Sequence, residues 1–134
     1  DGLYKLALCY KTLCFQDHKK DPQVALDTYY SLLDKFPYSI WRDPALLDIG
    51  EIGFFRGFWA DGVFGYETYI EENQQDVLDD AWTFYRLGYC YEMLSNFEHA
   101  ISNYKIAMHN KPGSNEAILA QARLDHLCSL GYCD

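Results

Sequence analysis

The chain has 134 residues, a formal net charge of −9 and a hydrophobic fraction of 49%. This length and apolar content suit one domain with a sizeable core and exclude a disordered chain. The acidic balance argues against a nucleic-acid partner, because phosphate contacts need clustered Lys and Arg. No apolar run approaches the roughly 18 residues of a membrane span.

The first predicted hairpin covers residues 3–37. Its first helix, over 2–15, is expected to have an apolar face made of Leu3, Leu6, Ala7, Tyr10 and Leu13. Asp21 is a favoured N-cap and Pro22 a favoured first helical residue, so a second helix is predicted from there to about Phe36. The residues expected to face inward are Val24, Ala25, Leu32 and Leu33.

The second predicted hairpin covers residues 43–76, and Asp43-Pro44 repeats the helix-start signal. Gly50, Gly53 and Gly57 fall on one face of its first helix. Each glycine costs up to about 1 kcal/mol against Ala in a helix interior. Two interpretations stay open: neighbouring helices press close there, or a ligand backbone needs the clearance. Residues 58–62 are expected to form a tight aromatic loop.

The third predicted hairpin covers residues 81–114. Its two apolar stripes are Phe84, Leu87, Gly88 and Tyr91, then Ala100, Tyr104 and Ala107. Ser95-Asn96 breaks the pattern between the two helices, and Pro112 closes the unit. A last helix over 115–130 has an apolar stripe of Ala117, Ala120, Leu124, Leu127 and Cys128. One apolar and one polar face suit a cap, or the first helix of a fourth repeat.

The third unit resembles the tetratricopeptide repeat, whose pattern is an aromatic, then L-G-x2-Y, then A-x3-F and a closing Pro. Small Gly88 and Ala100 are expected where its two helices cross. Weaker copies precede it, with Tyr29 and Tyr66 where Tyr104 stands. The resemblance covers residues 3–114. It implies an all-α, right-handed α-α superhelix of three helical hairpins plus the capping helix, in a single domain over 1–134.

The junctions between the units resemble the bacterial envelope branch of this family. That branch includes the Tol-Pal accessory protein and the outer-membrane-assembly lipoprotein. Pro37-Tyr38-Ser39 is followed by Asp43-Pro44-Ala45, and Pro112-Gly113-Ser114 repeats the P-x-S motif. The cysteines count against a periplasmic home, so the compartment stays open between the bacterial envelope and the cytoplasm.

Five cysteines cannot form a complete internal disulfide set. Cys9 and Cys90 occupy equivalent first-helix positions, which favours small buried hydrophobes. Cys128 and Cys133 could pair. With His126 they match no common zinc pattern, so no metal and no cofactor are expected. No catalytic motif appears, and the four histidines are expected to face solvent or to be satisfied.

In this family the first helices of successive repeats line a groove that holds peptides. The first-helix positions turned away from the Leu-Gly-Tyr stripe are Tyr4, Leu8, Lys11, Leu47, Glu51, Phe54, Phe55, Trp82, Tyr85, Tyr89 and Glu92. Exposed aromatic residues commonly anchor partners. We therefore predict a non-enzymatic protein- or peptide-binding scaffold, in which Glu51 and Glu92 favour a basic or neutral partner.

Three alternatives accompany this prediction. In the first, the cap helix or a second copy covers the aromatic residues. In the second, the chain is a self-associating scaffold, a homodimer that uses the apolar edges left by the first and last helices. The chain would otherwise be a recruiting or regulatory part of a larger enzyme. A groove of the type that grips chaperone carboxylates is rejected, since only Lys11 and Arg86 are basic there.

Overall fold

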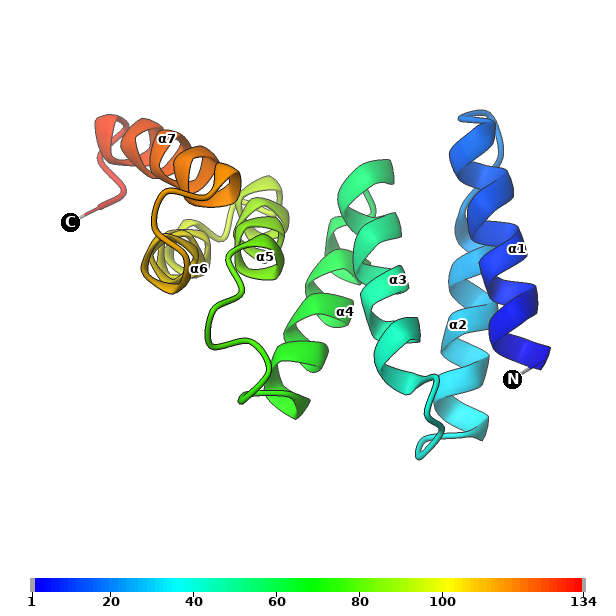
Figure 1. Cartoon of the computed structure of the whole chain (residues 1–134). Helices are drawn as coiled ribbons and strands as arrows, with labels where there is room; N and C mark the ends of the chain where they lie inside the picture. The colour runs from blue at the N-terminus through cyan, green and yellow to red at the C-terminus, as the bar shows by residue number, and fades with distance from the viewer. Residues whose placement is uncertain (1, 134) are drawn as a thin grey trace. The chain divides into compact units, whose positions relative to one another are not determined.

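A computed structural model of the chain describes residues 2–133. These residues form seven helices and no strands, which confirms the expected all-helical fold (Figure 1). The helices are α1 (Gly2–Gln16), α2 (Gln23–Lys35), α3 (Arg42–Arg56), α4 (Trp59–Glu72), α5 (Trp82–Met93), α6 (Phe97–Asn110) and α7 (Asn115–Ser129). None of these helices combines the length and the apolarity that crossing a membrane requires.

The chain divides into two compact units, Asp1–Gly65 and Tyr66–Asp134, called unit 1 and unit 2 below. The division falls inside α4, which contributes its first half to unit 1 and its second half to unit 2. Each unit buries its own set of apolar side chains, so each is described by itself.

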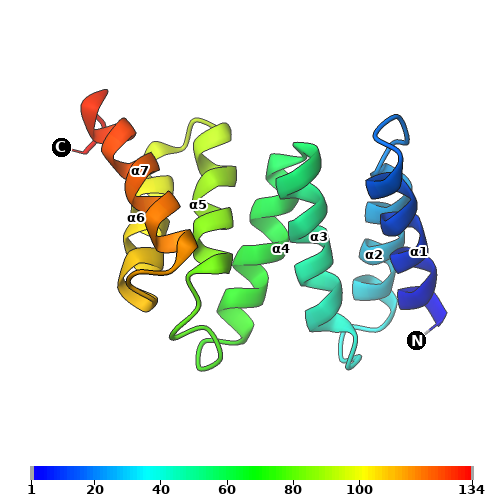
Figure 2. The same cartoon turned by 45° about the horizontal axis from the view of Figure 1, so that its top comes forward.

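In unit 1, α1 and α2 form a helical hairpin, and α3 packs on α2 (Figure 2). Fully or almost fully buried side chains line these contacts: Ala7, Cys14, Ala25, Leu26, Tyr29, Leu32, Leu46, Ile49 and Ile52. They recur at helical spacing on each helix, so the apolar periodicity of the sequence accounts for the hairpin.

The first turns of α4 cross α3 with the two backbones in direct contact. A Cβ added to Gly53 would lie 2.2 Å from the backbone nitrogen of Gly62, and one added to Gly65 would lie 2.5 Å from that of Gly50. The glycines are therefore explained by close helix packing, and that interpretation is confirmed for Gly50 and Gly53.

Gly57 does not belong to that face, so its predicted place was wrong. It ends α3 in the left-handed conformation, with φ 78°, which glycine adopts without steric cost. The predicted loop over 58–62 was also wrong, because α4 already begins at Trp59. At its other end α3 begins at Arg42, ahead of the Asp43-Pro44 signal.

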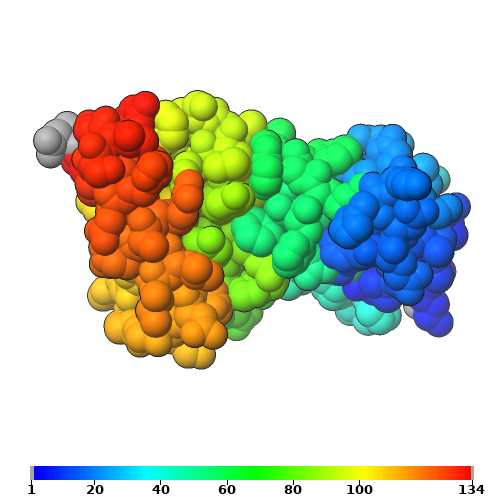
Figure 3. Space-filling model, turned by 90° about the horizontal axis from the view of Figure 1, so that it is seen from above, coloured from blue at the N-terminus to red at the C-terminus, as the bar shows by residue number. Residues whose placement is uncertain are grey.

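Unit 2 contains the hairpin of α5 and α6, and α7 packs against both helices. A Cβ on Gly88 would lie 2.9 Å from Cδ1 of Tyr104 and 3.2 Å from the carbonyl oxygen of Ala100, which confirms the predicted crossing point. In the turn, Ser95 has φ 62°, and the Asn96 side chain caps α6. The outer face of α7 lies open at the surface in Figure 3 (orange to red).

Several apolar residues expected inside are exposed. Leu6 and Leu13 on α1 and Val24 on α2 are about half exposed. Cys9 is exposed although its counterpart Cys90 is buried. Among the described residues, no helix lies against the outer side of α1. Equivalent positions of the repeat, such as Cys9 and Cys90, therefore differ in burial. At the other end, Cys128 is exposed and forms a disulfide with Cys133.

Candidate functional site

One tyrosine position repeats through the chain and organises the polar contacts around the first helices. Tyr29, Tyr66 and Tyr104 are fully buried. The Tyr29 hydroxyl donates to Oδ2 of Asp48 at 2.8 Å, 19 residues later, and the Tyr66 hydroxyl accepts from Arg86 at 3.2 Å, 20 residues later. Each bond reaches the first helix of the following hairpin, so it ties one repeat to the next.

The predicted unit 1 residues nearest this tyrosine form a closed ionic cluster. Lys11 Nζ lies 2.9 Å from Asp48 Oδ1 and 2.5 Å from Glu51 Oε1, and the Tyr4 hydroxyl donates to Asp48 at 2.8 Å. Burial lowers the pKa of Lys11, but its hydrogen bonds to Glu51 and Asp48 outweigh this and the pKa is raised. Lys11 is therefore charged and is shared by the carboxylates of Asp48 and Glu51.

The aromatic residues of unit 1 gather beside this cluster. Tyr4 stacks on Trp41 with ring centroids 4.9 Å apart. Phe55 meets Phe54 edge to face at 5.0 Å and meets Phe15 edge to face at 6.0 Å. Phe55 remains 56% exposed. An exposed ring held by two neighbouring rings presents a rigid apolar surface.

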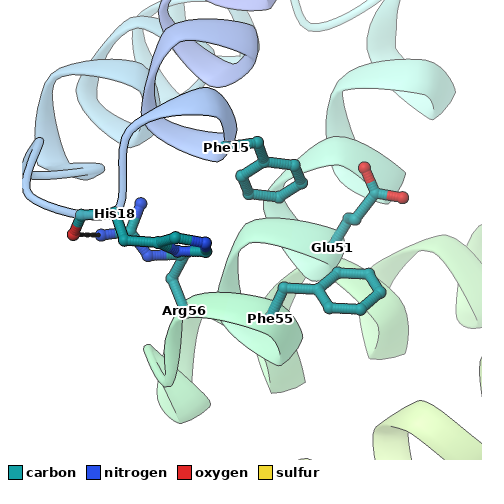
Figure 4. Close-up of a pocket in the computed structure, with 5 residues that line it drawn as sticks. All are labelled: Phe15, His18, Glu51, Phe55 and Arg56. Atoms are coloured by element: carbon teal, nitrogen blue, oxygen red, sulfur yellow. Dashed lines mark hydrogen bonds between the residues drawn. The ribbon is translucent and has the colours of Figure 1, made fainter.

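Phe55 borders a pocket of about 380 Å³ on the surface of unit 1 (Figure 4). The pocket is lined by Phe15, His18, Glu51, Phe55 and Arg56. Figure 4 shows the two phenylalanine rings and the Glu51 carboxylate on one side, with His18 and Arg56 opposite. The combination of apolar walls and a few polar groups is typical of a binding pocket.

Arg56 fixes the far wall of this pocket. Its guanidinium donates to the carbonyl oxygens of Cys14 at 2.6 Å, His18 at 2.8 Å and Lys20 at 3.0 Å. It therefore holds the α1–α2 turn against the end of α3. Sequence reasoning missed Phe15, His18 and Arg56. The repeat pattern assigns no role to His18 in the long α1–α2 turn, or to Phe15 and Arg56 at the helix ends beside that turn.

The remaining predicted residues of unit 1 lie beside these groups. Leu8 is exposed on α1, and Leu47 is half-buried on α3. The structure thus brings Tyr4, Lys11 and Glu51 into one network, and Phe54 and Phe55 into one aromatic contact.

In unit 2 two of the predicted aromatic residues of α5 are paired with arginines, one from α5 itself and one from α7. The Arg86 guanidinium lies 3.7 Å from the centroid of the Trp82 ring, and that of Arg123 lies 5.7 Å from the centroid of the Tyr89 ring. Tyr85 lies between Trp82 and Tyr89 in the sequence, and its ring centroid is 6.3 Å from that of Tyr89. All three rings are half-buried.

Glu92 is not on the edge of an open surface, so that prediction was wrong. It is only 7% exposed. Its Oε1 accepts a 2.7 Å hydrogen bond from Tyr104 and one of 3.1 Å from Nε of Arg123, and its Oε2 pairs with the same guanidinium. The hydrogen bond to Glu92 raises the pKa of Arg123. A buried carboxylate needs such a partner, and here the partner comes from the last helix.

Repeated helical hairpins, small residues at the crossings and a buried tyrosine in each hairpin define the architecture. Residues 1–39 match the model of the tetratricopeptide repeat family. The match covers the first helical hairpin, α1 and α2, and shows a similarity to this family over that part of the chain. No relative was found among curated proteins. Within residues 2–133, no three His, Cys, Asp or Glu side chains cluster as metal ligands would.

Proposed function

We propose that the chain is a non-catalytic tetratricopeptide module that binds an extended or helical segment of a partner protein, with the Phe15–Phe55 pocket of unit 1 as its anchor site. Tetratricopeptide repeats generally mediate protein–protein interactions. The observation that carries the finer proposal is the exposed ring of Phe55, held at the mouth of a pocket of about 380 Å³. Pockets that lose their water on binding provide most of the binding energy at many interfaces.

The partner is expected to be basic or neutral, and an apolar side chain is expected to enter the pocket. The reason for the charge preference differs from the one the sequence suggested. Lys11 pairs with Glu51 as well as with Asp48, and Arg123 pairs with Glu92, so each of the two predicted carboxylates already has a cation beside it. The net charge of −9 acts instead over a longer range, by steering a cationic partner toward the surface.

A second contact surface is proposed on α5 of unit 2. Trp82, Tyr85 and Tyr89 present half-buried rings, two of them covered by arginines. Because guanidinium groups already cover the Trp82 and Tyr89 rings, this surface offers less open aromatic area than the exposed Phe55 ring does. A scaffold for a multiprotein assembly would use both surfaces.

Membership of the bacterial envelope branch remains part of this proposal. The P-x-S and D-x-A junctions support it, and so does the Cys128–Cys133 disulfide, a bond that persists in oxidising compartments such as the periplasm. Self-association is the alternative with a structural observation behind it, because α1 leaves Leu6 and Leu13 exposed.

The proposal is tested by selecting peptides from a random 12-residue display library on the immobilised chain. Wild type is expected to enrich peptides with an apolar anchor, and Phe55→Ser is expected to lose them. Phe36→Ser is the matched control, since Phe36 is 53% exposed on the α2–α3 connection of the same unit. Equal enrichment of the same peptides by Phe55→Ser and wild type would assign binding to another surface.

A further inference from the structure

A pocket of about 310 Å³ lies within unit 2, beside the connection between α4 and α5. Its apolar lining comes from α4, the connection, α5 and α6, through Ile70, Val77, Leu78, Phe84 and Ile106. It is called the Leu78 pocket below. Pockets that hold whole small molecules measure about 300–1,000 Å³, so a hollow of this size suits one or two side chains of a partner.

The connection that forms the rim of this pocket is held in place by side chains from both neighbouring helices. Asn110, at the end of α6, donates to the carbonyl oxygens of Val77 and Asp80 at 3.1 Å each. The Asp80 carboxylate accepts from the backbone nitrogen of Thr83 at 2.9 Å and from its hydroxyl at 2.7 Å. The rim is therefore formed before any partner binds, so binding costs little ordering of the chain.

This fixed rim presents an open leucine. Leu78 is 67% exposed, although the preceding residue, Val77, is only 5% exposed. On the α6 wall, Ile106 is 39% exposed. Exposed apolar groups beside a hollow mark an interaction site more clearly than single exposed residues on a flat surface do.

The Leu78 pocket is separate from the other surfaces of unit 2. Around the axis of α5, the rings of Trp82, Tyr85 and Tyr89 lie about 100–160° from Phe84, at 3.6 residues per turn. On α6, Met108 lies on the side opposite Ile106 and borders a different hollow, next to α7. The α5 aromatic surface and the contact with α7 thus use other sides of these helices.

The chain beside the pocket is acidic. Residues 70–80 contain no Lys or Arg and carry the carboxylates of Glu71, Glu72, Asp76, Asp79 and Asp80. Asp76 and Asp79 are exposed and directly adjoin pocket residues in the chain. Within residues 2–133, neither of these two side chains has an ion pair or a hydrogen bond. Lys105 on α6 lies about 100° around the helix from Ile106 and does not line the pocket, so the local charge is negative.

We infer that the Leu78 pocket binds a short basic segment of a partner protein. A leucine or phenylalanine side chain of the segment enters the hollow, and its lysine or arginine side chains lie beside Asp76 and Asp79. The apolar anchor provides most of the affinity, and the two carboxylates provide the preference for cations. Like charges oppose a second copy of this acidic chain as the occupant. The Phe15–Phe55 pocket belongs to unit 1, so either site can exist without the other.

Three synthetic peptides, each with blocked ends, serve as probes. The first is Lys-Lys-Leu-Gly-Leu-Lys-Lys. The second replaces every lysine by glutamate, and the third replaces both leucines by serine. Each is titrated at low ionic strength, up to about 5 mM, into the isotope-labelled full chain, and binding is followed by NMR from the amide chemical shifts. Shifts over residues 74–80 and 106–110 report on the Leu78 pocket, and shifts over residues 51–56 report on the Phe15–Phe55 pocket.

The lysine–leucine peptide is expected to shift the amides of residues 74–80 and 106–110, with a Kd of about 0.1–1 mM. The serine peptide and the glutamate peptide should bind there about tenfold more weakly, because each lacks one of the two contacts. Leu78→Ser should weaken binding of the lysine–leucine peptide by about tenfold. Leu94→Ser is the matched control and should leave the affinity unchanged, since Leu94 is 45% exposed at the opposite end of α5 from Phe84.

The charge contribution is tested by Asp76→Asn/Asp79→Asn, which should weaken the same peptide by about threefold. The matched control is Glu98→Gln/Asp125→Asn, which removes two exposed carboxylates from α6 and α7 of the same unit and should leave the affinity unchanged. Both double variants change the net charge equally, so their difference isolates the position of the charges.

No shift over residues 74–80 and 106–110 with the lysine–leucine peptide would overturn the inference, whatever happens over residues 51–56. Equal binding of the serine peptide, or unchanged binding to Leu78→Ser, would overturn the pocket as the anchor site. Equal weakening by the two double carboxylate variants would overturn the role of Asp76 and Asp79, by assigning the attraction to the charge of the whole chain.

Discussion

Arg123 on α7 reaches the carboxylate of Glu92 on α5, and this pair covers the buried hydroxyl of Tyr104. The last helix therefore does more than cover apolar surface. It provides the cation that makes a buried carboxylate tolerable, and this carboxylate in turn fixes the tyrosine at the centre of the α5–α6 crossing.

Arg123→Met should lower the free energy of unfolding by about 2–3 kcal/mol, because it leaves the Glu92 carboxylate buried without its cation. Urea denaturation followed by far-UV circular dichroism measures the loss. Gln121→Met, an exposed position on α7, is the control and should change stability little. Glu92→Gln should remove most of the cost of Arg123→Met in the double variant, and strictly additive losses would contradict the coupling.

Gly53→Ala should be more damaging than any ordinary helix substitution. Alanine favours helices over glycine by about 1 kcal/mol, but here its Cβ would lie 2.2 Å from the Gly62 backbone nitrogen, so the α3–α4 crossing must open. A loss of more than about 3 kcal/mol, or failure to fold, is expected in thermal denaturation. Gly2→Ala, where a Cβ meets nothing within 4 Å, should be neutral or stabilising.

Ser95→Gly should stabilise unit 2. Ser95 has φ 62°, a conformation that costs an L-residue about 1 kcal/mol and costs glycine almost nothing. A higher urea midpoint with an unchanged slope is the expected result. The same change at Ser102, an exposed position inside α6, should instead destabilise by about 0.5 kcal/mol. Equal signs for Ser95→Gly and Ser102→Gly would refute the explanation from backbone strain.

Stability should fall as the pH rises above 9, with Cys90 as a main cause. Burial raises the pKa of the Cys90 thiol from 9.0 to about 12, although nearby Arg86 lowers it in part. Between these values the unfolded chain loses a proton that the folded chain keeps, so the free energy of unfolding falls by up to about 1.4 kcal/mol per pH unit. Below pH 9 this contribution is fully present.

Urea denaturation between about pH 8.5 and pH 10 tests this linkage. The comparison is between Cys9→Ala and Cys9→Ala/Cys90→Ala, because removing the exposed Cys9 thiol prevents disulfide exchange in both. The variant without Cys90 should have the shallower pH dependence, whatever its stability at neutral pH. Identical slopes would show that Cys90 titrates alike in the folded and unfolded chain.

The sequence predicted the hairpins because their signals are local. Asn96 and Ser114 cap helices through their own side chains, and the tyrosines at 29, 66 and 104 recur at the repeat spacing. Gly57 shows the limit of such reasoning. In the sequence, a glycine at helical spacing is equally consistent with close helix packing and with the end of a helix. Only the backbone angle φ distinguishes these two roles.

The candidate site was predictable in its aromatic residues but not in its charges. Phe54 and Phe55 contact each other beside an open pocket, in accord with their place on a first helix. Glu92 was expected at the edge of the aromatic surface. The residues around it in the sequence do not indicate that its partner is Arg123, which lies 31 residues away on another helix. Lys11 and Glu51 were both expected at the surface, yet they pair across two helices.

The sequence by itself determined the seven helices and the register in which they repeat, because caps, breakers and apolar periodicity act over a few residues. Only the tertiary structure decided which apolar side chains are covered and which charges are balanced. Leu6 and Ile49 share one place in the repeat, but α2 lies in the stack beside Ile49 and no described helix lies over Leu6. Burial depends on what packs from elsewhere in the chain, and local spacing carries no information about that.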